Sequence, residues 1–120
     1  MNSQTAFRIS AVLGFLAVAL GAFGAHGLKA TFEANGQAAN WQTAAHYHLI
    51  HAAVMLGLAA VQPWRRIAWW LMLGGVVIFS GSLYMLALTN LKWLGAITPI
   101  GGLSLLAGWL VLALGKGRAD

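Results

Sequence analysis

The chain has 120 residues, no cysteine and a formal net charge of +5, and 60% of its residues are hydrophobic against 8% charged. Since soluble domains carry roughly one quarter charged residues, this composition indicates a single-domain integral membrane protein, and the lack of cysteine excludes disulfides, thiolate catalysis and cysteine metal ligands. The basic residues flank apolar segments, where they set orientation in the membrane, so we predict no nucleic-acid partner.

Four apolar segments are each long enough to cross a bilayer as a helix. The first, 7–27, begins beside Arg8 and carries small residues at three- and four-residue spacing, a pattern typical of a face that packs closely on a neighbouring helix: Gly14, Ala17, Gly21 and Gly24. A cleaved signal peptide is the alternative interpretation of this segment, but its length favours a membrane helix.

Residues 28–40 form the only sizeable polar connection between these segments, and they include Glu33, the sole glutamate. Leu28 and Phe32 lie four residues apart, and Gly36 follows where a helix could end. We therefore expect a short helix here, lying at the membrane surface.

The second membrane helix is predicted at 43–62, with Asn40 or Thr43 as its N-terminal cap. Its first half carries three histidines, each of which needs a polar partner or a cavity at membrane depth: His46, His48 and His51. At 100° per residue, two of them share one face with a methionine, and this set forms the candidate metal ligands: His48, His51 and Met55. The alternative role of these imidazoles is to hydrogen-bond backbone carbonyls or Tyr84 and so hold the helices together.

A short basic hairpin leads into the third predicted helix, 67–88, and the fourth follows at 94–114. Both carry small residues at helical spacing that predict packing faces: Ala68, Gly75, Ser82 and Thr89 in the third, and Gly101, Ser104 and Gly108 in the fourth. Ser80 and Ser82 lie near a histidine, but the sequence orients no base toward them, so we predict no enzyme activity.

Thr98 and Pro99 lie near the start of the fourth helix. Proline disfavours helix at the preceding residue but suits the first helical position, so either Thr98 caps a helix that begins at Pro99, or Pro99 kinks a longer helix. A helix start here would direct free N–H groups at the outer polar region, where they could bind an anion or a lipid headgroup.

The distribution of Lys and Arg predicts both termini on the cytoplasmic side. Five basic residues flank the inner ends of the four segments: Arg8, Arg65, Arg66, Lys116 and Arg118. Only Lys29 and Lys92 flank the outer ends. The predicted fold is therefore an all-α membrane protein, an antiparallel bundle of four transmembrane helices, N-in and C-in.

This orientation also predicts where the tryptophans lie. Trp41 and Trp93 lie at the outer interface, and the other tryptophans toward the inner one: Trp64, Trp69, Trp70 and Trp109.

Polar side chains gather in the outer halves of these helices, which predicts a polar cavity there. Tyr84 lies within about one turn of His51 in depth, so we expect the two to hydrogen-bond between helices. We predict a non-enzymatic module, with no cofactor, that binds membrane lipid or a membrane protein partner through the connection at 28–40 and this cavity. The alternative is a histidine-based metal or haem protein for ion or electron transfer. Uncovered small-residue faces also predict a homo-oligomer.

Several stretches carry a family likeness: GAFGAHGLK at 21–29, the pattern of Trp41, Thr43, Tyr47 and His51, FSGSLYMLAL at 79–88, and TPIGGLSLLAGW at 98–109. Together they resemble the YgdD-type family of small inner-membrane proteins, also called domain-of-unknown-function family 423 (UPF0382-like). The resemblance implies a multi-pass protein of the bacterial inner (cytoplasmic) membrane with four helices, and it brings no activity with it. His26 and His51 match the family pattern, so the candidate ligand-binding residues narrow to His26, His51, Tyr84 and Thr98.

Overall fold

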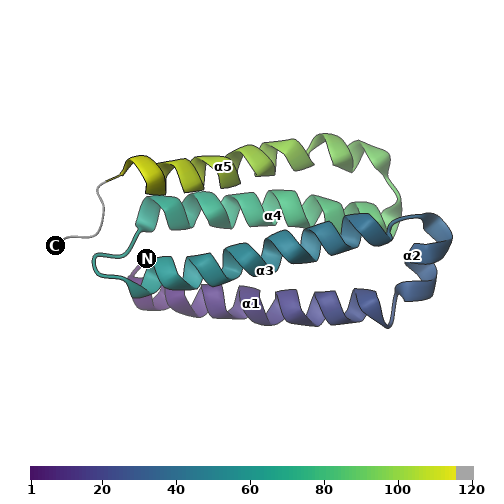
Figure 1. Cartoon of the computed structure of the whole chain (residues 1–120), viewed down its shortest axis with the longest axis horizontal. Coiled ribbons are helices and arrows are strands. Elements are labelled where there is room, and N and C mark those ends of the chain that lie inside the picture. Colours follow the sequence, from purple (N-terminus) through teal and green to yellow (C-terminus); the bar gives the residue numbers. More distant parts are fainter. Residues whose placement is uncertain (116–120) are drawn as a thin grey trace.

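Four long helices lie side by side in the computed structural model, which describes residues 1–115, and a short helix closes one end (Figure 1). The long helices are α1 (Ser3–Ala25), α3 (Ala38–Ala60), α4 (Arg66–Thr89) and α5 (Thr98–Leu114). The short helix is α2 (Lys29–Asn35), and a 3-10 helix, η1 (Lys92–Ala96), precedes α5. Successive long helices run antiparallel, so α1 begins and α5 ends at the same end of the molecule (Figure 1). The predicted all-α class is confirmed for the described residues.

Two helices begin earlier than their apolar segments do. Helix α1 starts at Ser3 because the Asn2 side chain caps it, accepting a hydrogen bond from the Thr5 backbone N–H at 2.8 Å. Helix α3 starts at Ala38, so Asn40 and Thr43 lie inside it and the prediction that one of them caps the helix is wrong. An apolar run marks the part of a helix suited to hydrocarbon, whereas the helix itself continues into polar residues.

The connection between α1 and α3 contains the short helix that the sequence predicts. Helix α2 ends at Gly36, whose φ of 74° lies in the left-handed region that favours glycine. Phe32 turns into the protein and is 2% exposed, with its ring centroid 5.1 Å from that of Trp41. The chain then enters α3 after only Gly36 and Gln37, so α2 lies directly across the ends of α1 and α3.

The core lies along α3 and α4, and the two outer helices each attach to this pair through one stripe. Helix α1 packs on α3 and helix α5 packs on α4. The buried stripe of α1 consists of Ala6, Ser10, Ala17 and Gly24, and that of α5 of Thr98, Gly101, Leu105 and Gly108. The small-residue faces predicted for the first and fourth segments are thus the packing stripes in part, although Gly14 has open space beside it.

Two tryptophan side chains, Trp41 and Trp69, are buried in the core. Trp69 is 0% exposed and donates from Nε1 to Ser10 Oγ at 2.8 Å, which ties α4 to α1. Trp41 is 3% exposed. The sequence placed both at the membrane interface, but in each case a neighbouring helix covers the ring and supplies a hydrogen-bond acceptor. Trp93 is 61% exposed.

The outward faces of the helices are apolar, as a hydrocarbon solvent requires. Phe15 is 73% exposed and Leu114 is 78% exposed, and large apolar side chains of this kind cover the surface of α1 and α5. Three segments are long and apolar enough to cross a membrane: Ser3–Ala25, Arg66–Thr89 and Lys92–Leu114. Helix α3 has the length, but it carries the three histidines and is not among these segments.

The α4–α5 seam depends on the absence of a side chain at Gly101. A Cβ atom there would overlap the backbone of Phe79 on α4, whereas one at Gly81 would meet nothing within 4 Å. We expect Gly101→Ala to lower the free energy of unfolding by about 1–3 kcal/mol, because the two backbones must separate. Gly81→Ala, in the neighbouring helix, should cost nothing. Unfolding followed by circular dichroism in mixed micelles measures both, and equal stability of the two variants would contradict the seam.

Candidate functional site

His48 forms a buried tie between α3 and α4. Its Nδ1 lies 2.9 Å from the Tyr84 hydroxyl, and the imidazole is only 4% exposed. Tyr84 therefore pairs with His48, and the predicted hydrogen bond between Tyr84 and His51 is wrong. His48 and His51 lie on the same side of α3, but they are three residues apart and so point in somewhat different directions. His48 meets α4 and His51 meets α5.

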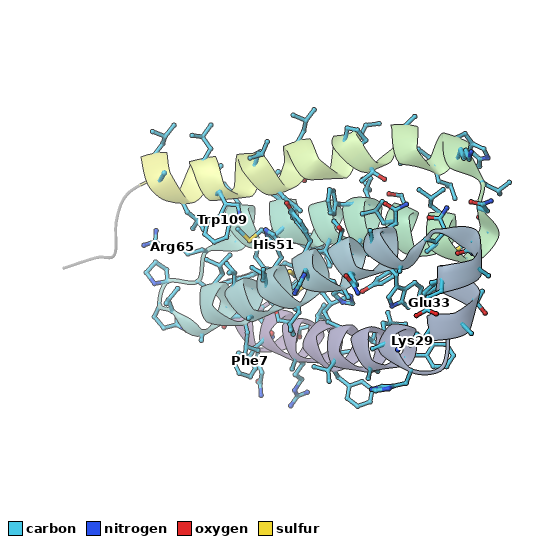
Figure 2. All side chains as sticks on the ribbon, turned by 45° about the vertical axis from the view of Figure 1, so that its right-hand side comes forward. Phe7, Lys29, Glu33, His51, Arg65 and Trp109 are labelled. Atoms are coloured by element: carbon cyan, nitrogen blue, oxygen red, sulfur yellow. The ribbon has the colours of Figure 1, made fainter. Side chains whose placement is uncertain are left out.

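His51 uses both ring nitrogens inside the protein. Its Nδ1 lies 2.7 Å from the carbonyl oxygen of Tyr47, and its Nε2 accepts a hydrogen bond from Trp109 Nε1 at 3.0 Å. A carbonyl can only accept and an indole N–H can only donate, so the proton is on Nδ1 and the ring is neutral. The second of these bonds joins α3 to α5, and the labelled side chains lie close together in Figure 2.

These contacts do not fit a metal site built on the predicted set. The lone pair on His51 Nε2 already accepts the indole proton, so a metal would have to displace Trp109. Met55 is fully buried in the apolar cluster that contains Trp69 and Met72. Residues 1–115 contain no group of three or more His, Cys, Asp or Glu side chains placed to hold a metal ion.

Hydroxyl groups join α5 and α4. Ser82 Oγ and Thr98 Oγ1 lie 2.6 Å apart, and Thr98 also donates to the Leu94 carbonyl at 3.3 Å. The Thr98 hydroxyl therefore points back along the chain, and the prediction that it caps the fourth helix is wrong, because Ile97 is the capping residue. Pro99 lies in the first turn of α5, so it starts this helix and does not kink it.

The four predicted ligand-binding residues are not brought together. His26 lies exposed just after the end of α1. The other three lie in three different seams: Tyr84 between α3 and α4, His51 between α3 and α5, and Thr98 between α4 and α5. Ligand binding by these residues stays a prediction, and three of them already serve as ties between helices.

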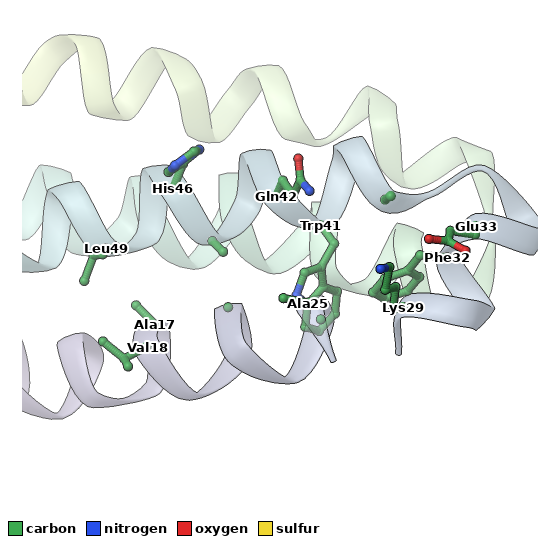
Figure 3. Close-up of a pocket in the computed structure, with 14 residues that line it drawn as sticks. Ala17, Val18, Ala25, Lys29, Phe32, Glu33, Trp41, Gln42, His46 and Leu49 are labelled. Carbon is green, nitrogen blue, oxygen red and sulfur yellow. The ribbon is translucent and has the colours of Figure 1, made fainter. Parts of the chain in front are cut away.

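A groove of about 500 Å³ lies elsewhere, between α1, α2 and α3 (Figure 3). Its apolar walls come from α1 and α3, including Ala17, Val18, Gly21, Ala45 and Leu49. Four polar side chains also line it: Lys29 and Glu33 from α2, and Gln42 and His46 from α3. These four polar side chains are all exposed. This groove combines an apolar floor with charged groups at one end.

Trp41 forms the wall of the groove beside α2. Its Nε1 donates to the Leu20 carbonyl of α1 at 2.8 Å, and its ring centroid lies 4.7 Å from that of Tyr84. Glycine is required at position 24, because a Cβ atom there would overlap the indole ring. The indole therefore lies directly against α1 and closes the groove at this end.

Sequence reasoning included the connection at 28–40, which carries Lys29 and Glu33, in the binding region, but it did not predict this groove. It placed the polar cavity around His51 and Tyr84, because polar residues share that depth in the membrane. Two signals pointed to the groove: His46 falls off the face shared by His48 and His51, and Glu33 is the sole glutamate. Neither signal shows that α2 folds back over the seam between α1 and α3.

Comparison with known proteins identifies one family of membrane proteins that the chain matches. Residues 20–102 match the family model described as "Protein of unknown function (DUF423)". The chain is 43% identical over 125 residues to the UPF0382 inner membrane protein YgdD of Escherichia coli (strain K12), with 98% of this chain and 93% of that protein covered. It is 42% identical over 110 residues to the UPF0382 membrane protein SH2409 of Staphylococcus haemolyticus, with 88% and 89% covered. No solved structure matches.

The bond between His51 and Trp109 can be measured with a double-mutant cycle. His51→Leu leaves the indole N–H unpaired, and Trp109→Phe leaves the imidazole nitrogen unpaired, so the double variant should be more stable than the sum of the two losses predicts. We expect a coupling of about 0.6 kcal/mol, with about 1.7 kcal/mol as the upper bound seen between membrane helices. Pairing His51→Leu with Trp93→Phe, an exposed tryptophan, gives the control. Equal coupling in both cycles would refute the contact.

Proposed function

The chain belongs to the DUF423 family of membrane proteins of unknown function, and on that basis we propose that it is a non-enzymatic, multi-pass protein of the bacterial inner membrane that binds membrane lipid. The binding site in this proposal is the groove between α1, α2 and α3. The observation that carries it is the polarity of that groove, which changes from charged at the α2 end to apolar between α1 and α3.

We propose that α3 crosses the membrane together with the three apolar segments. Its 23 residues span about 35 Å, and it lies between α1 and α4 along its length. His48 and His51, which lower its hydropathy, are 4% and 5% exposed and face protein, not lipid. Such shielding is how polar residues are accommodated at membrane depth.

The proposed orientation is N-in and C-in. Arg65 lies in the hairpin between α3 and α4, at the end where α1 begins, and Lys29 lies at the opposite end (Figure 2). Arg66 follows as the first residue of α4. Basic residues favour the cytoplasmic side, so the hairpin end faces the cytoplasm and α2 faces outward. Lys116 and Arg118, which contribute to the sequence-based count, lie outside the described residues.

Reporter fusions test this orientation. Alkaline phosphatase inserted after Gly36 should be active, because the loop between α1 and α3 reaches the outer side, and a fluorescent reporter fused after the last residue should mature in the cytoplasm. A C-terminal fusion that is active only outside the cytoplasm would overturn the orientation. The same fusions in an Arg65→Gln, Arg66→Gln variant show whether these two charges set it.

Lipid fits the groove in size and in chemistry. Ligand sites are typically about 300–1,000 Å³ and mostly apolar, with a few polar groups that fix orientation. The groove also opens at the outward surface between α1 and α3, where Val18 is 61% exposed and Leu49 is 43% exposed. An acyl chain can therefore enter from the bilayer without crossing a polar surface.

His51 does not favour the alternative of a metal or haem protein, because both of its ring nitrogens serve the protein itself, whereas the buried Nε2 of His48 has no hydrogen-bond partner within residues 1–115. A membrane protein partner and self-association remain predictions. Open space beside Gly14 and Gly57 leaves room for a second helix to approach closely, which is what self-association requires.

Filling the groove should displace the lipid. Val18→Trp places a large ring at the groove, whereas Val12→Trp places the same ring on the same helix at a position that is 57% exposed and does not line it. We expect Val18→Trp to weaken lipid retention about tenfold, equivalent to about 1.4 kcal/mol, and Val12→Trp to leave it unchanged. Native mass spectrometry of the purified protein with added phospholipid measures this. Equal retention in both variants would refute the groove as the lipid site.

A further inference from the structure

We propose that the groove between α1, α2 and α3 selects a phospholipid whose headgroup carries a primary ammonium beside its phosphate. This inference rests on the proposed function of the same groove and specifies the chemistry of its ligand. Lys29 would bind the phosphate, Glu33 would bind the ammonium, and the apolar walls would hold an acyl chain.

The first observation is that the groove carries one charge of each sign. Lys29 and Glu33 both line it from α2, and in Figure 3 their side chains lie at the same end, beside Phe32. Glu33 is one of only two acidic residues in a chain that has seven lysines and arginines. Lys29 alone would suit an anionic lipid, whereas Lys29 and Glu33 together suit a ligand that carries an anionic and a cationic group.

An ion pair between Lys29 and Glu33 within α2 would be weak, so both side chains can still bind a ligand. Lys29 and Glu33 are four residues apart, but lysine precedes glutamate, and this order is the weaker one for an ion pair along a helix. Both side chains are exposed, where such pairs contribute little. A ligand that offers a phosphate to Lys29 and an ammonium to Glu33 therefore replaces a weak contact with two.

The second observation is the order of residue types along the groove. Gln42 and His46 follow the charged end along α3, about 6 Å apart in depth, and Leu49 lies about 4.5 Å further. On α1, the facing residues toward the same depth are Gly21, Val18 and Ala17. Charged groups, then hydrogen-bonding groups, then aliphatic side chains reproduce the order of headgroup, ester region and acyl chain in a phospholipid.

The two charged side chains, Lys29 and Glu33, also distinguish between lipid headgroups. A glycerol headgroup leaves the lipid with a net negative charge, which Lys29 attracts and Glu33 repels. A trimethylated ammonium is positive but has no N–H to donate to the carboxylate. Only a headgroup with a primary ammonium satisfies both side chains with charge-assisted hydrogen bonds.

A competition between two lipids with identical acyl chains tests this selection. The full chain in mild detergent is mixed with equal amounts of dioleoyl phosphatidylethanolamine and dioleoyl phosphatidylglycerol, and native mass spectrometry gives the ratio of the two bound species. We expect the ethanolamine lipid to be bound in about 1.4-fold to fivefold excess, the range set by exposed charge pairs of about 0.2–1 kcal/mol. Dioleoyl phosphatidylcholine in place of the glycerol lipid should also be disfavoured.

Two variants assign the selection to its residues. Glu33→Gln should abolish the excess of ethanolamine lipid and favour the glycerol lipid, because Lys29 remains. Lys29→Gln should weaken both lipids by a similar factor, because both carry a phosphate. Lys92→Gln is the matched control, since it removes an exposed lysine outside the groove, in η1, and should change neither lipid.

The outcomes separate the two proposals. If wild-type protein binds the lipids equally while Val18→Trp still reduces binding, the selection is refuted and the lipid groove stands. If Val18→Trp has no effect, the groove is not the lipid site and both proposals fail. If the excess persists in Glu33→Gln, a group other than Glu33 recognises the ammonium and the selection argued here is wrong.

Discussion

Close approach of helix backbones is the constraint on which this structure depends. Between helices in hydrocarbon there is no hydrophobic driving force, so dispersion contacts and hydrogen bonds must hold the helices together. Small residues bring the backbones into contact, as Gly101 does against Phe79. Once the backbones are close, side-chain hydroxyls reach carbonyls on the next helix: Ser80 donates to Ala44 and Ser104 donates to Leu71. The glycines and the serines therefore act together: the glycines allow close contact between helices, and the serines form hydrogen bonds across that contact.

The same constraint divides the polar residues into two groups. Buried groups such as His48, His51 and Ser82 take partners on neighbouring helices, and they stabilise the bundle. Exposed polar groups at the α2 end do not hold helices together, and they include Glu33, the sole glutamate of the chain. A histidine in a membrane helix is therefore not by itself evidence of a ligand site. The partners of each ring nitrogen decide between structure and function.

Local signals in the sequence predicted much of the fold. The length of the apolar segments, the spacing of small residues and the position of Gly36 each depend on residues close in the chain, and the structure agrees with them. The pairing of His51 was predicted wrongly because a helical wheel gives the face of a residue but not the helix that the face meets. The groove was not predicted for a related reason, since its lining brings together residues of α1, α2 and α3, and the sequence does not show how these helices meet.

The residues that line the groove all fall between positions 17 and 49. A polypeptide is synthesised from its N-terminus, so α1, α2 and α3 leave the ribosome before α4 and α5 do. The first helical hairpin thus contains every residue that lines the groove. A lipid that binds in this groove needs only the first hairpin, because no residue of α4 or α5 lines it.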